Sequence, residues 1–349
     1  MQEKRDIRAL EKEEIAEFFI KNNEKAFRAK QVYEWLWKKN VASFDEMTNI
    51  SKVNIALLKD HFVINHIAVD SFQKSSDGTV KNAVKLHDGL IVESVMIPAA
   101  NRTTACISSQ VGCSLACTFC ATALLKRQRN LTASEIYDQV AAINKESLLY
   151  HDHKLSNIVF MGMGEPLLNY ANVMEAIKMI TSDEGLAMSP RRITLSTVGL
   201  PKMIKRMADE GVRFNLAVSL HSAIDEIRSK MMPINDVSNL EDLMDALQYW
   251  HAKTDNRITF EYVIWKGIND TRKDVEALVK YCKRVPVKVN LIEYNAIDSN
   301  DFKQADKKAV AMYLEVLEAN NIIVNIRRSR GKDIDAACGQ LANKEAKTV

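Results

Sequence analysis

The sequence predicts an α/β protein whose main part is a partial (β/α)6 barrel, preceded by a small helical domain and a short β-meander. Apolar residues recur at helical spacing at the start of the chain, and short β-rich runs follow them. From about residue 104 onward, strands alternate with helices, which is typical of βαβ units and a parallel sheet. The expected parts are an accessory domain at 1–62, a β-rich extension at 63–100 and a barrel core at 101–349.

The composition limits the classes of protein to which this chain can belong. The 349-residue chain carries a formal net charge of only +3, so its partners have to be inferred from local clusters rather than from overall charge. Its start is charged and lacks the apolar run of a signal peptide, and no apolar stretch is long enough to cross a bilayer. Four of the six cysteines lie in one loop, which points to a reducing compartment. We expect a cytoplasmic monomer with no membrane partner.

The first 62 residues predict three helices. Leu10, Ile15 and Phe18 form one apolar stripe, and Ser51 is placed to cap a later helix. Basic residues gather around the second predicted helix: Lys25, Arg28, Lys30, Lys38 and Lys39. A solvated helix face accounts for such a cluster by itself. With a nucleic-acid substrate, the same cluster becomes a module that contacts phosphates.

The extension reads as a small meander with turns at 75–78 and 87–89. Its last run, 90–97, is apolar on both faces except for Glu93. Burying a carboxylate there is costly unless the group is paired or used. The alternative is an exposed acid at a strand end.

The barrel core contains seven candidate strands. Thr132 and Glu135 form a T-x-x-E capping box at the start of the first intervening helix. Six or seven units make most of a barrel but cannot close an eight-fold one, so we favour a partial barrel over a flat doubly wound sheet. The strands are expected at 104–108, 157–161, 192–197, 215–220, 258–263, 287–292 and 322–326.

Three cysteines, Cys113, Cys117 and Cys120, have the spacing C-x3-C-x2-C. Three thiolates on one loop can bind three irons of a four-iron cluster and leave the fourth iron open to a chelating ligand such as S-adenosylmethionine. A structural zinc would need a fourth ligand, and no Cys or His follows at finger spacing. Disulfides would need an oxidising context that the sequence does not indicate.

Polar and Gly-rich features follow several predicted strands. Such positions gather at the carboxyl ends of barrel strands, where active sites form. The run M-G-M-G-E-P-L at 161–167 places Gly164 and Glu165 after the second strand, and two glycines allow a close approach to a ligand. A simple glycine turn is the alternative. Side chains that could bind a ribose, a carboxylate or an adenine edge follow at Ser196, Ser219, Leu220, His221, Tyr294 and Asn295.

The remaining cysteines have different surroundings. Cys282 lies in a helix-like segment and is expected to be a small buried hydrophobe. Cys106 lies on the first barrel strand, seven residues before Cys113, and Cys338 follows the last strand in a polar loop. If the barrel brings its first and last strands together, these two thiols could meet and form a transient disulfide.

These motifs together resemble the RlmN-like radical S-adenosylmethionine methyltransferases, which methylate adenosines in RNA. The resemblance covers essentially the whole chain. It rests on C-x3-C-x2-C with Phe119 before the last cysteine, M-G-M-G-E-P-L, S-L-H-S at 219–222 and D-A-A-C-G-Q-L around Cys338. It implies a radical SAM barrel, one [4Fe-4S] cluster and S-adenosylmethionine. It further implies methylation of adenosine carbon 2 in 23S rRNA and, in some members, of the adenosine beside the tRNA anticodon.

The resemblance also assigns roles to residues. On the family pattern, Cys338 accepts a methyl group, a deoxyadenosyl radical takes a hydrogen atom from it, and the resulting carbon radical adds to adenine. Glu93 aligns with the proton acceptor, and attack by Cys106 on the Cys338 sulfur releases the product and forms a disulfide. The implied electron donor is a flavodoxin or ferredoxin. The aligned cofactor-contacting positions are Gly164, Glu165, Ser196, Ser219, Leu220, His221 and Asn295.

Three other functions share parts of this pattern. The antibiotic-resistance branch methylates carbon 8 of the same nucleotide and has the same reactive cysteines, but it typically lacks a proline at the position of Pro166, which favours carbon 2 here. A radical enzyme acting on a small molecule or a protein would not need Cys106 and Cys338 together. A zinc-stabilised RNA-binding protein would contain zinc without iron or sulfide.

Overall fold

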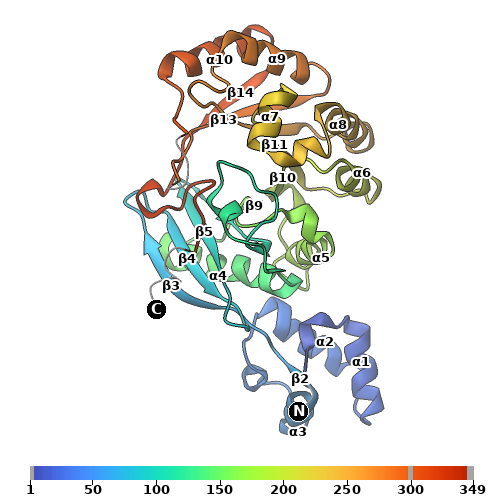
Figure 1. Ribbon diagram of the computed structural model, residues 1–349. Helices are drawn as coiled ribbons and strands as arrows, with labels where there is room; N and C mark the ends of the chain where they lie inside the picture. Colours follow the sequence, from blue (N-terminus) through green and yellow to red (C-terminus); the bar gives the residue numbers. More distant parts are fainter. Residues whose placement is uncertain (1–3, 298–301, 344–349) are drawn as a thin grey trace.

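The computed structural model describes residues 4–297 and 302–343. Its centre is a ten-stranded sheet with the order β14-β13-β12-β11-β10-β9-β6-β5-β4-β3, of which the seven strands from β6 to β14 are parallel neighbours (Figure 1). Each lies within two residues of its predicted position. They are β6 Arg102–Cys106, β9 Asn157–Phe160, β10 Ile193–Thr197, β11 Asn215–Ser219, β12 Ile258–Val263, β13 Val287–Ile292 and β14 Ile323–Arg327.

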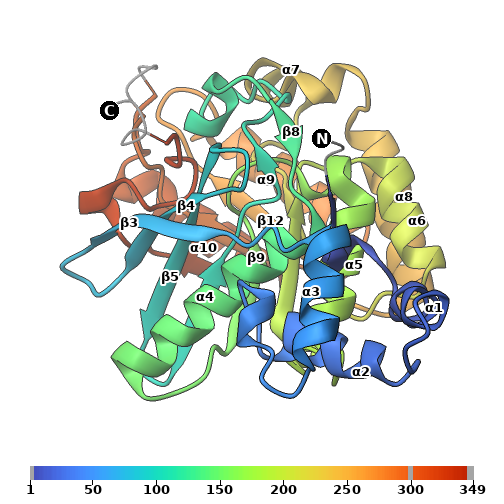
Figure 2. The same ribbon diagram turned by 90° about the horizontal axis from the view of Figure 1, so that it is seen from below.

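Helices connect the parallel strands and cover the outer side of the sheet (Figure 2). The predicted capping box is present, because the Thr132 hydroxyl accepts from the backbone N–H of Glu135 and the Glu135 carboxylate accepts from that of Thr132. Within the described residues, no helix has the length and apolar character that a membrane span requires. The helices are α4 Ala133–His151, α5 Tyr170–Thr181, α6 Pro201–Asp209, α7 Asp225–Met231, α8 Leu240–Thr254, α9 Arg272–Cys282 and α10 Lys307–Ala319.

The chain begins with helices α1 (Lys12–Lys21), α2 (Arg28–Tyr33) and α3 (Lys52–His61), and a π-helical turn at Glu34–Lys38 extends α2. Ser51 caps α3 as predicted, since its hydroxyl accepts from the Asn54 N–H at 3.2 Å. Two short strands, β1 (Arg5–Asp6) and β2 (Phe62–Val63), pair in parallel beside these helices.

A buried ion pair joins this helical part to the barrel. The Arg8 guanidinium donates to both carboxylate oxygens of Asp138 on α4, at 2.8 and 2.9 Å, and neither side chain is exposed. Nearby, the Tyr137 hydroxyl donates to the Trp37 carbonyl at 2.6 Å. Breaking a buried pair by removing one partner typically costs about 3–5 kcal/mol, so this contact holds the helices firmly on α4.

The meander continues the barrel sheet. β3 (Ala68–Lys74), β4 (Val80–Lys85) and β5 (Ile91–Ala99) pair in antiparallel fashion, and β5 also pairs antiparallel with β6. The connections fall at the two predicted turns. Because β14 and β3 are the two end strands of this sheet, the barrel is open rather than closed, as expected for a partial barrel.

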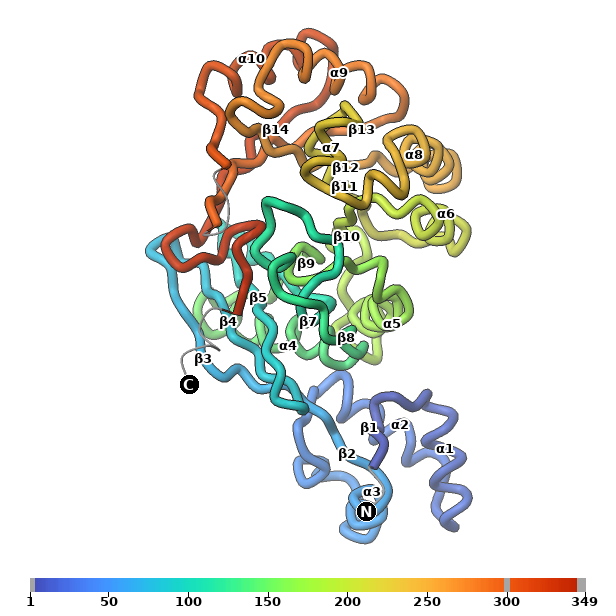
Figure 3. Tube along the Cα trace, viewed as in Figure 1, coloured from blue at the N-terminus to red at the C-terminus, as the bar shows by residue number. Residues whose placement is uncertain are grey.

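The C-terminal segment after β14 lies against the meander and the loops above the barrel (Figure 3). Asp333 accepts from the Ser75 hydroxyl at 2.6 Å and from the Ser76 N–H at 3.0 Å, and Asp77 accepts from the Gly331 N–H at 3.0 Å. The first predicted turn thus holds the segment that carries Cys338.

Two further short strands, β7 (Gln110–Val111) and β8 (Arg129–Asn130), pair on either side of the cysteine loop. The short 3-10 helices are η1 Ile7–Ala9, η3 Phe44–Glu46, η4 Ala121–Leu124, η5 Pro166–Asn169, η6 Pro190–Arg192, η7 Pro233–Asp236 and η8 Lys332–Ile334.

Candidate functional site

A cavity opens at the carboxyl ends of the parallel strands, where active sites of such barrels form. It encloses about 1120 Å³ of space, including its mouth toward solvent. Most of the residues that the sequence singled out line it: Cys113, Cys117, Cys120, Gly164, Glu165, Ser196, Ser219, His221, Tyr294, Asn295 and Cys338. Of the other candidates, Leu220 and Glu93 are buried and do not line it, and Cys106 lines a second, smaller cavity.

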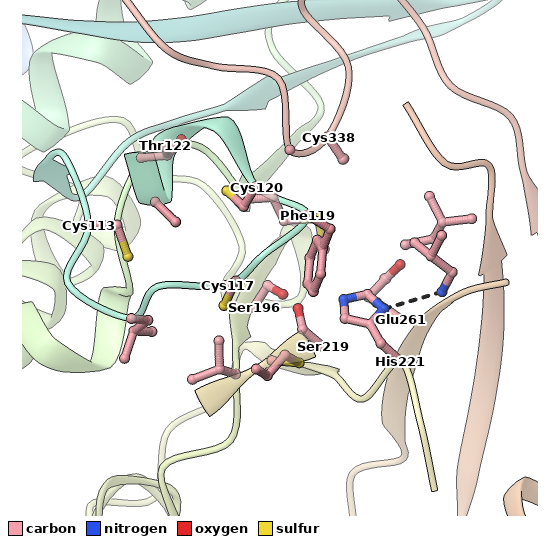
Figure 4. A pocket seen from close by; sticks show the side chains of 18 of the residues that line it. Cys113, Cys117, Phe119, Cys120, Thr122, Ser196, Ser219, His221, Glu261 and Cys338 are labelled. Atoms are coloured by element: carbon pink, nitrogen blue, oxygen red, sulfur yellow. Dashed lines mark hydrogen bonds between the residues drawn. The ribbon is translucent and has the colours of Figure 1, made fainter. Parts of the chain in front are cut away.

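The cysteine loop is held by backbone contacts. Gly112 has a positive φ of 75°, and a Cβ there would come within 2.5 Å of the Lys126 carbonyl oxygen, so only glycine fits before Cys113. The Cys113 N–H donates to the Leu125 carbonyl at 3.2 Å, and the Thr118 N–H donates to the Met231 carbonyl at 3.0 Å. Figure 4 shows how the three cysteine side chains are carried on this loop.

All six cysteines are unbonded in the structure, so the triplet is not a disulfide site here. Burial raises the pKa of Cys113, Cys117 and Cys120, and a bound cation would favour their thiolate forms. Within the described residues, no three His, Cys, Asp or Glu side chains gather as the ligands of one metal ion. A closed structural zinc site needs four ligands, whereas three cysteines can bind a four-iron cluster and leave one iron open.

The turn after β9 packs closely against the β6–β7 loop. A Cβ on Gly162 would approach the Ile107 carbonyl at 2.7 Å, and one on Gly164, whose φ is 91°, would approach the Gln110 side chain at 2.5 Å. The sequence led us to expect glycines that admit a ligand. The structure shows that both glycines are needed for the close packing against this neighbouring loop.

Glu165 is 3% exposed and follows this turn. Its carboxylate accepts from the backbone N–H groups of Leu167 at 3.1 Å and Val198 at 3.0 Å. Burial nevertheless raises its pKa to about 7, against the lowering effect of these hydrogen bonds. An ammonium group in the cavity would favour the ionised carboxylate.

His221 is a neutral hydrogen-bonding group. It has a left-handed backbone (φ 57°), and its Nδ1 accepts from the Val263 N–H at 3.2 Å, which leaves Nε2 as the protonated nitrogen (Figure 4). Burial and the nearby Arg228 lower its pKa to about 3. The imidazole therefore stays uncharged at physiological pH.

Two aromatic side chains lie next to His221. The Phe119 ring lies edge-on to the imidazole with centroids 4.9 Å apart, and the Trp265 ring lies 5.6 Å from the imidazole and 5.1 Å from Phe119. Trp265 was not identified from the sequence, because a single tryptophan just past a strand carries no spacing signal.

Two polar atoms in the cavity wall have no protein partner. The Trp265 Nε1 donor and the Asn295 Oδ1 acceptor are buried and unpaired. Leaving such groups unsatisfied costs about 1–3 kcal/mol each, so they are expected to bind a ligand that brings an acceptor and a donor. S-adenosylmethionine has both in its ribose, adenine and amino acid parts. The donor set thus fits this cofactor.

The fold brings Cys106 and Cys338 together. Both line a smaller second cavity, and Cys338 also lines the main one. Burial raises the pKa of Cys106 to about 12, the Cys338 thiol adds to this rise, and Arg327 acts against it. Arg327, at the end of β14, lines both cavities and lies 3.5 Å from the Glu261 carboxylate. It was not identified from the sequence.

The Cys338 segment is fastened to the cysteine loop and to the barrel. The Ala121 N–H donates to the Gly339 carbonyl at 2.7 Å, and the Thr122 hydroxyl donates to the Leu341 carbonyl at 2.7 Å. The Asn295 amide donates to the Cys338 carbonyl at 3.2 Å. One side of the segment is therefore attached to the loop that carries the three cysteines.

Glu93 is buried, not exposed at a strand end. It is 3% exposed in β5, and its Oε2 accepts from the backbone N–H groups of Ala342 at 2.8 Å and Asn343 at 3.2 Å. Lys81 lies 3.5 Å from its Oε1. The carboxylate is thus paired, and it holds the far side of the Cys338 segment.

Comparisons with known proteins identify the class and then the family. Residues 107–282 match the model of the Radical SAM superfamily, and residues 5–64 match the ribosomal RNA large subunit methyltransferase N-terminal domain. A crystal structure of a radical SAM methyltransferase from Sphaerobacter thermophilus superposes with a TM-score of 0.91 at 35% identity, covering 97% of this chain and 99% of that one. The protein is a radical SAM enzyme with the corresponding α/β fold.

Relatives named "Probable dual-specificity RNA methyltransferase RlmN" cover nearly the whole chain. The one from Flavobacterium johnsoniae is 65% identical over 99% of both chains. The one from Cytophaga hutchinsonii is 52% identical over 99% of this chain and 94% of its own length. The chain therefore belongs to the RlmN family of radical SAM RNA methyltransferases. The resemblance in its motifs is confirmed, and the family implies S-adenosylmethionine and a [4Fe-4S] cluster.

Proposed function

We propose that this enzyme methylates carbon 2 of an adenosine in 23S rRNA, and of the adenosine adjacent to the tRNA anticodon, through an S-methylated Cys338. The observation that carries the proposal is the meeting of Cys106 and Cys338 at the edge of the cavity that the cluster cysteines line. A radical enzyme acting on a small molecule would have no use for this second pair of thiols.

Cys113, Cys117 and Cys120 would bind the cluster, and the cavity wall would bind S-adenosylmethionine. Glu165 would accept from the amino group of S-adenosylmethionine, and His221, through Nε2, would donate to an acceptor atom of the cofactor. Gly164, Ser196, Ser219, Leu220 and Asn295 are proposed to complete its site. When bound, the two groups supply a methyl group and a carbon-centred radical. Radical chemistry suits the target, because adenine carbon 2 is too electron-poor to attack a sulfonium methyl as a nucleophile.

Three residues of the chain are proposed to act on the methyl group and the base. The Cys338 sulfur accepts the methyl group and holds its carbon at the border between the two cavities. Glu93 takes the proton from carbon 2. The Cys106 thiolate then attacks the Cys338 sulfur, and the electron pair of the broken sulfur–carbon bond goes to the methylene carbon, which takes up a proton to become the methyl group. The methylated base is released and a Cys106–Cys338 disulfide remains. Arg327, which faces both thiols, would stabilise the thiolates.

Basic side chains on the N-terminal helices are proposed to contact the RNA backbone. Lys25, Lys30 and Lys38 are exposed, and none of them forms an ion pair in the described part of the chain. A base inside a helix has to leave the stack before carbon 2 can reach Cys338. We propose that a monomer acts, with a flavodoxin or ferredoxin as electron donor.

The test is methylation of protein-free 23S rRNA by the reconstituted enzyme, followed by nuclease digestion and mass spectrometry. We expect 2-methyladenosine. An 8-methyladenosine product would place the enzyme with the antibiotic-resistance branch and overturn the carbon-2 assignment. Purified tRNA and assembled large subunits, tested in parallel, would show whether tRNA is a substrate and whether the rRNA is modified before assembly.

A further inference from the structure

Arg228 is a buried cation with neutral partners. It is 1% exposed, and its guanidinium donates to the Val198 carbonyl at 2.6 Å, the Leu220 carbonyl at 3.2 Å and the Asn235 side-chain oxygen at 2.7 Å. Among the described residues, no carboxylate oxygen lies within the 4.0 Å that defines an ion pair with it. All its hydrogen-bonding partners are thus carbonyl or amide oxygens.

The nearest carboxylate is reached only through an amide. The Asn235 Nδ2 donates to Asp225 Oδ1 at 2.9 Å, and Asp225 is exposed to solvent. A charge in the interior is costly unless an opposite charge accompanies it. Neutral donors could satisfy the carbonyls at the ends of β10 and β11, so the hydrogen bonds alone do not explain why a cation occupies this position.

Arg228 lies on a helix that contacts the cysteine loop. It belongs to α7, whose last residue, Met231, accepts from both the N–H and the hydroxyl of Thr118, at 3.0 and 3.3 Å. Cys117, beside Thr118, is buried and packs in one apolar cluster with Met231 and Met232. Val198, whose carbonyl accepts from Arg228 at 2.6 Å, belongs to the same cluster.

We propose that Arg228 supplies the interior positive charge opposite the thiolate-bound cluster and thereby sets the potential at which the cluster is reduced. The proposal rests on the cluster site proposed above. Reduction adds one electron from a donor of the flavodoxin class, which is oxidised by one electron, and no bond is made or broken. The cluster gains one negative charge in this step, so a fixed cation nearby favours the reduced form.

The test compares reduction potentials of anaerobically reconstituted proteins, measured by redox titration with electron paramagnetic resonance. Arg228→Gln removes the charge, and Arg228→Lys keeps it with fewer donors. We expect Arg228→Gln to lower the equilibrium constant for reduction at least tenfold, a shift of about 59 mV to more negative potential for a one-electron couple. Arg228→Lys should stay within about threefold of the wild type. Lys230→Gln, on the exposed side of the same helix, is the matched control and should not shift the potential.

Asn235→Asp provides a second measurement if Arg228→Gln does not retain its cluster. This nearly isosteric change keeps an acceptor for Arg228 and adds a compensating carboxylate. It is made together with Asp225→Asn, because the Asn235 amide donates to the Asp225 carboxylate at 2.9 Å in the wild type, and the combined change should also make the potential more negative. Equal potentials for the wild type, Arg228→Gln and Asn235→Asp/Asp225→Asn would overturn the proposal. So would an Arg228→Lys shift as large as that of Arg228→Gln, because the lost hydrogen bonds would then be the cause. Wild-type protein without iron and sulfide would instead refute the cluster site itself.

Discussion

The cysteine loop and the Cys106–Cys338 pair face the same site but are assembled in different ways. The loop's three thiols lie within one short stretch, held by local turns and backbone hydrogen bonds. The pair joins the end of β6 to a segment beyond β14, and contacts from the meander, from Asn295 and from Thr122 hold that segment in place. Local sequence thus builds the proposed cluster site, whereas the open barrel and its extension build the thiol pair.

Removing Cys338 should have the largest effect and should separate the two regions. Cys338→Ala leaves no sulfur to accept the methyl group, so methylation of RNA should fall below detection, while iron and sulfide contents stay at wild-type values. Methyl incorporation and metal analysis check this. Cys282→Ala is the matched control, since Cys282 is a buried core residue in α9, and it should retain activity. Sustained turnover by Cys338→Ala would contradict the proposed methyl acceptor.

Removing Cys106 should stop the reaction one step later. Cys106→Ala should still form the bond between RNA and Cys338 but should not release it, so a covalent complex should accumulate with at most one RNA per protein. Denaturing electrophoresis of labelled RNA detects the complex, and digestion by nuclease should abolish the shift. The double variant Cys106→Ala/Cys338→Ala should form no complex. Normal multiple turnover without Cys106 would contradict its role in release.

Glu165 lies on the side of the cavity where we propose that S-adenosylmethionine binds. Its pKa is raised to about 7 because it is buried, so the carboxyl is largely neutral below that pH and ionised above it. Affinity for S-adenosylmethionine should therefore increase as the pH rises through about 7. Glu165→Gln should remove this pH dependence and weaken binding by about 1.5–3 kcal/mol, roughly 10- to 100-fold.

Isothermal titration calorimetry of the cluster-loaded protein between pH 6 and pH 8.5, a range chosen as about 1–1.5 pH units on either side of that pKa, measures this dependence. The variant Glu226→Gln, which changes an exposed carboxylate on α7, is the control and should keep the wild-type profile. An unchanged pH profile in Glu165→Gln would rule out this carboxylate as the amino-group acceptor.

The same difference explains which features could be predicted from the sequence and which could not. The strand positions, the Ser51 cap, the Thr132–Glu135 capping box and the two meander turns depend on local chemistry, and all are confirmed. Arg327 and Trp265 were missed because their roles depend on which strand ends face one cavity. Local spacing cannot report that arrangement.

Glu93 was predicted only in part. The sequence showed a carboxylate inside an apolar strand, but it did not show which groups pair with that carboxylate. Those partners, Ala342 and Asn343, lie at the other end of the chain. The catalytic and binding roles of the individual residues remain predictions.

Thr122 links the two regions. Of the four residues changed in these predictions, it should give the smallest effect. It lies two residues after Cys120, the last of the proposed cluster ligands, and its hydroxyl donates to the buried Leu341 carbonyl at 2.7 Å. Thr122→Val keeps the shape but leaves that carbonyl unpaired, at a cost of about 1–3 kcal/mol. Methylation of Cys338 without RNA should slow a few-fold because the segment is held less firmly, and cluster content should not change. Thr122→Ser restores the donor and should recover the rate. If Thr122→Val loses iron and keeps the rate, the hydroxyl serves the cysteine loop alone, and the two regions are independent.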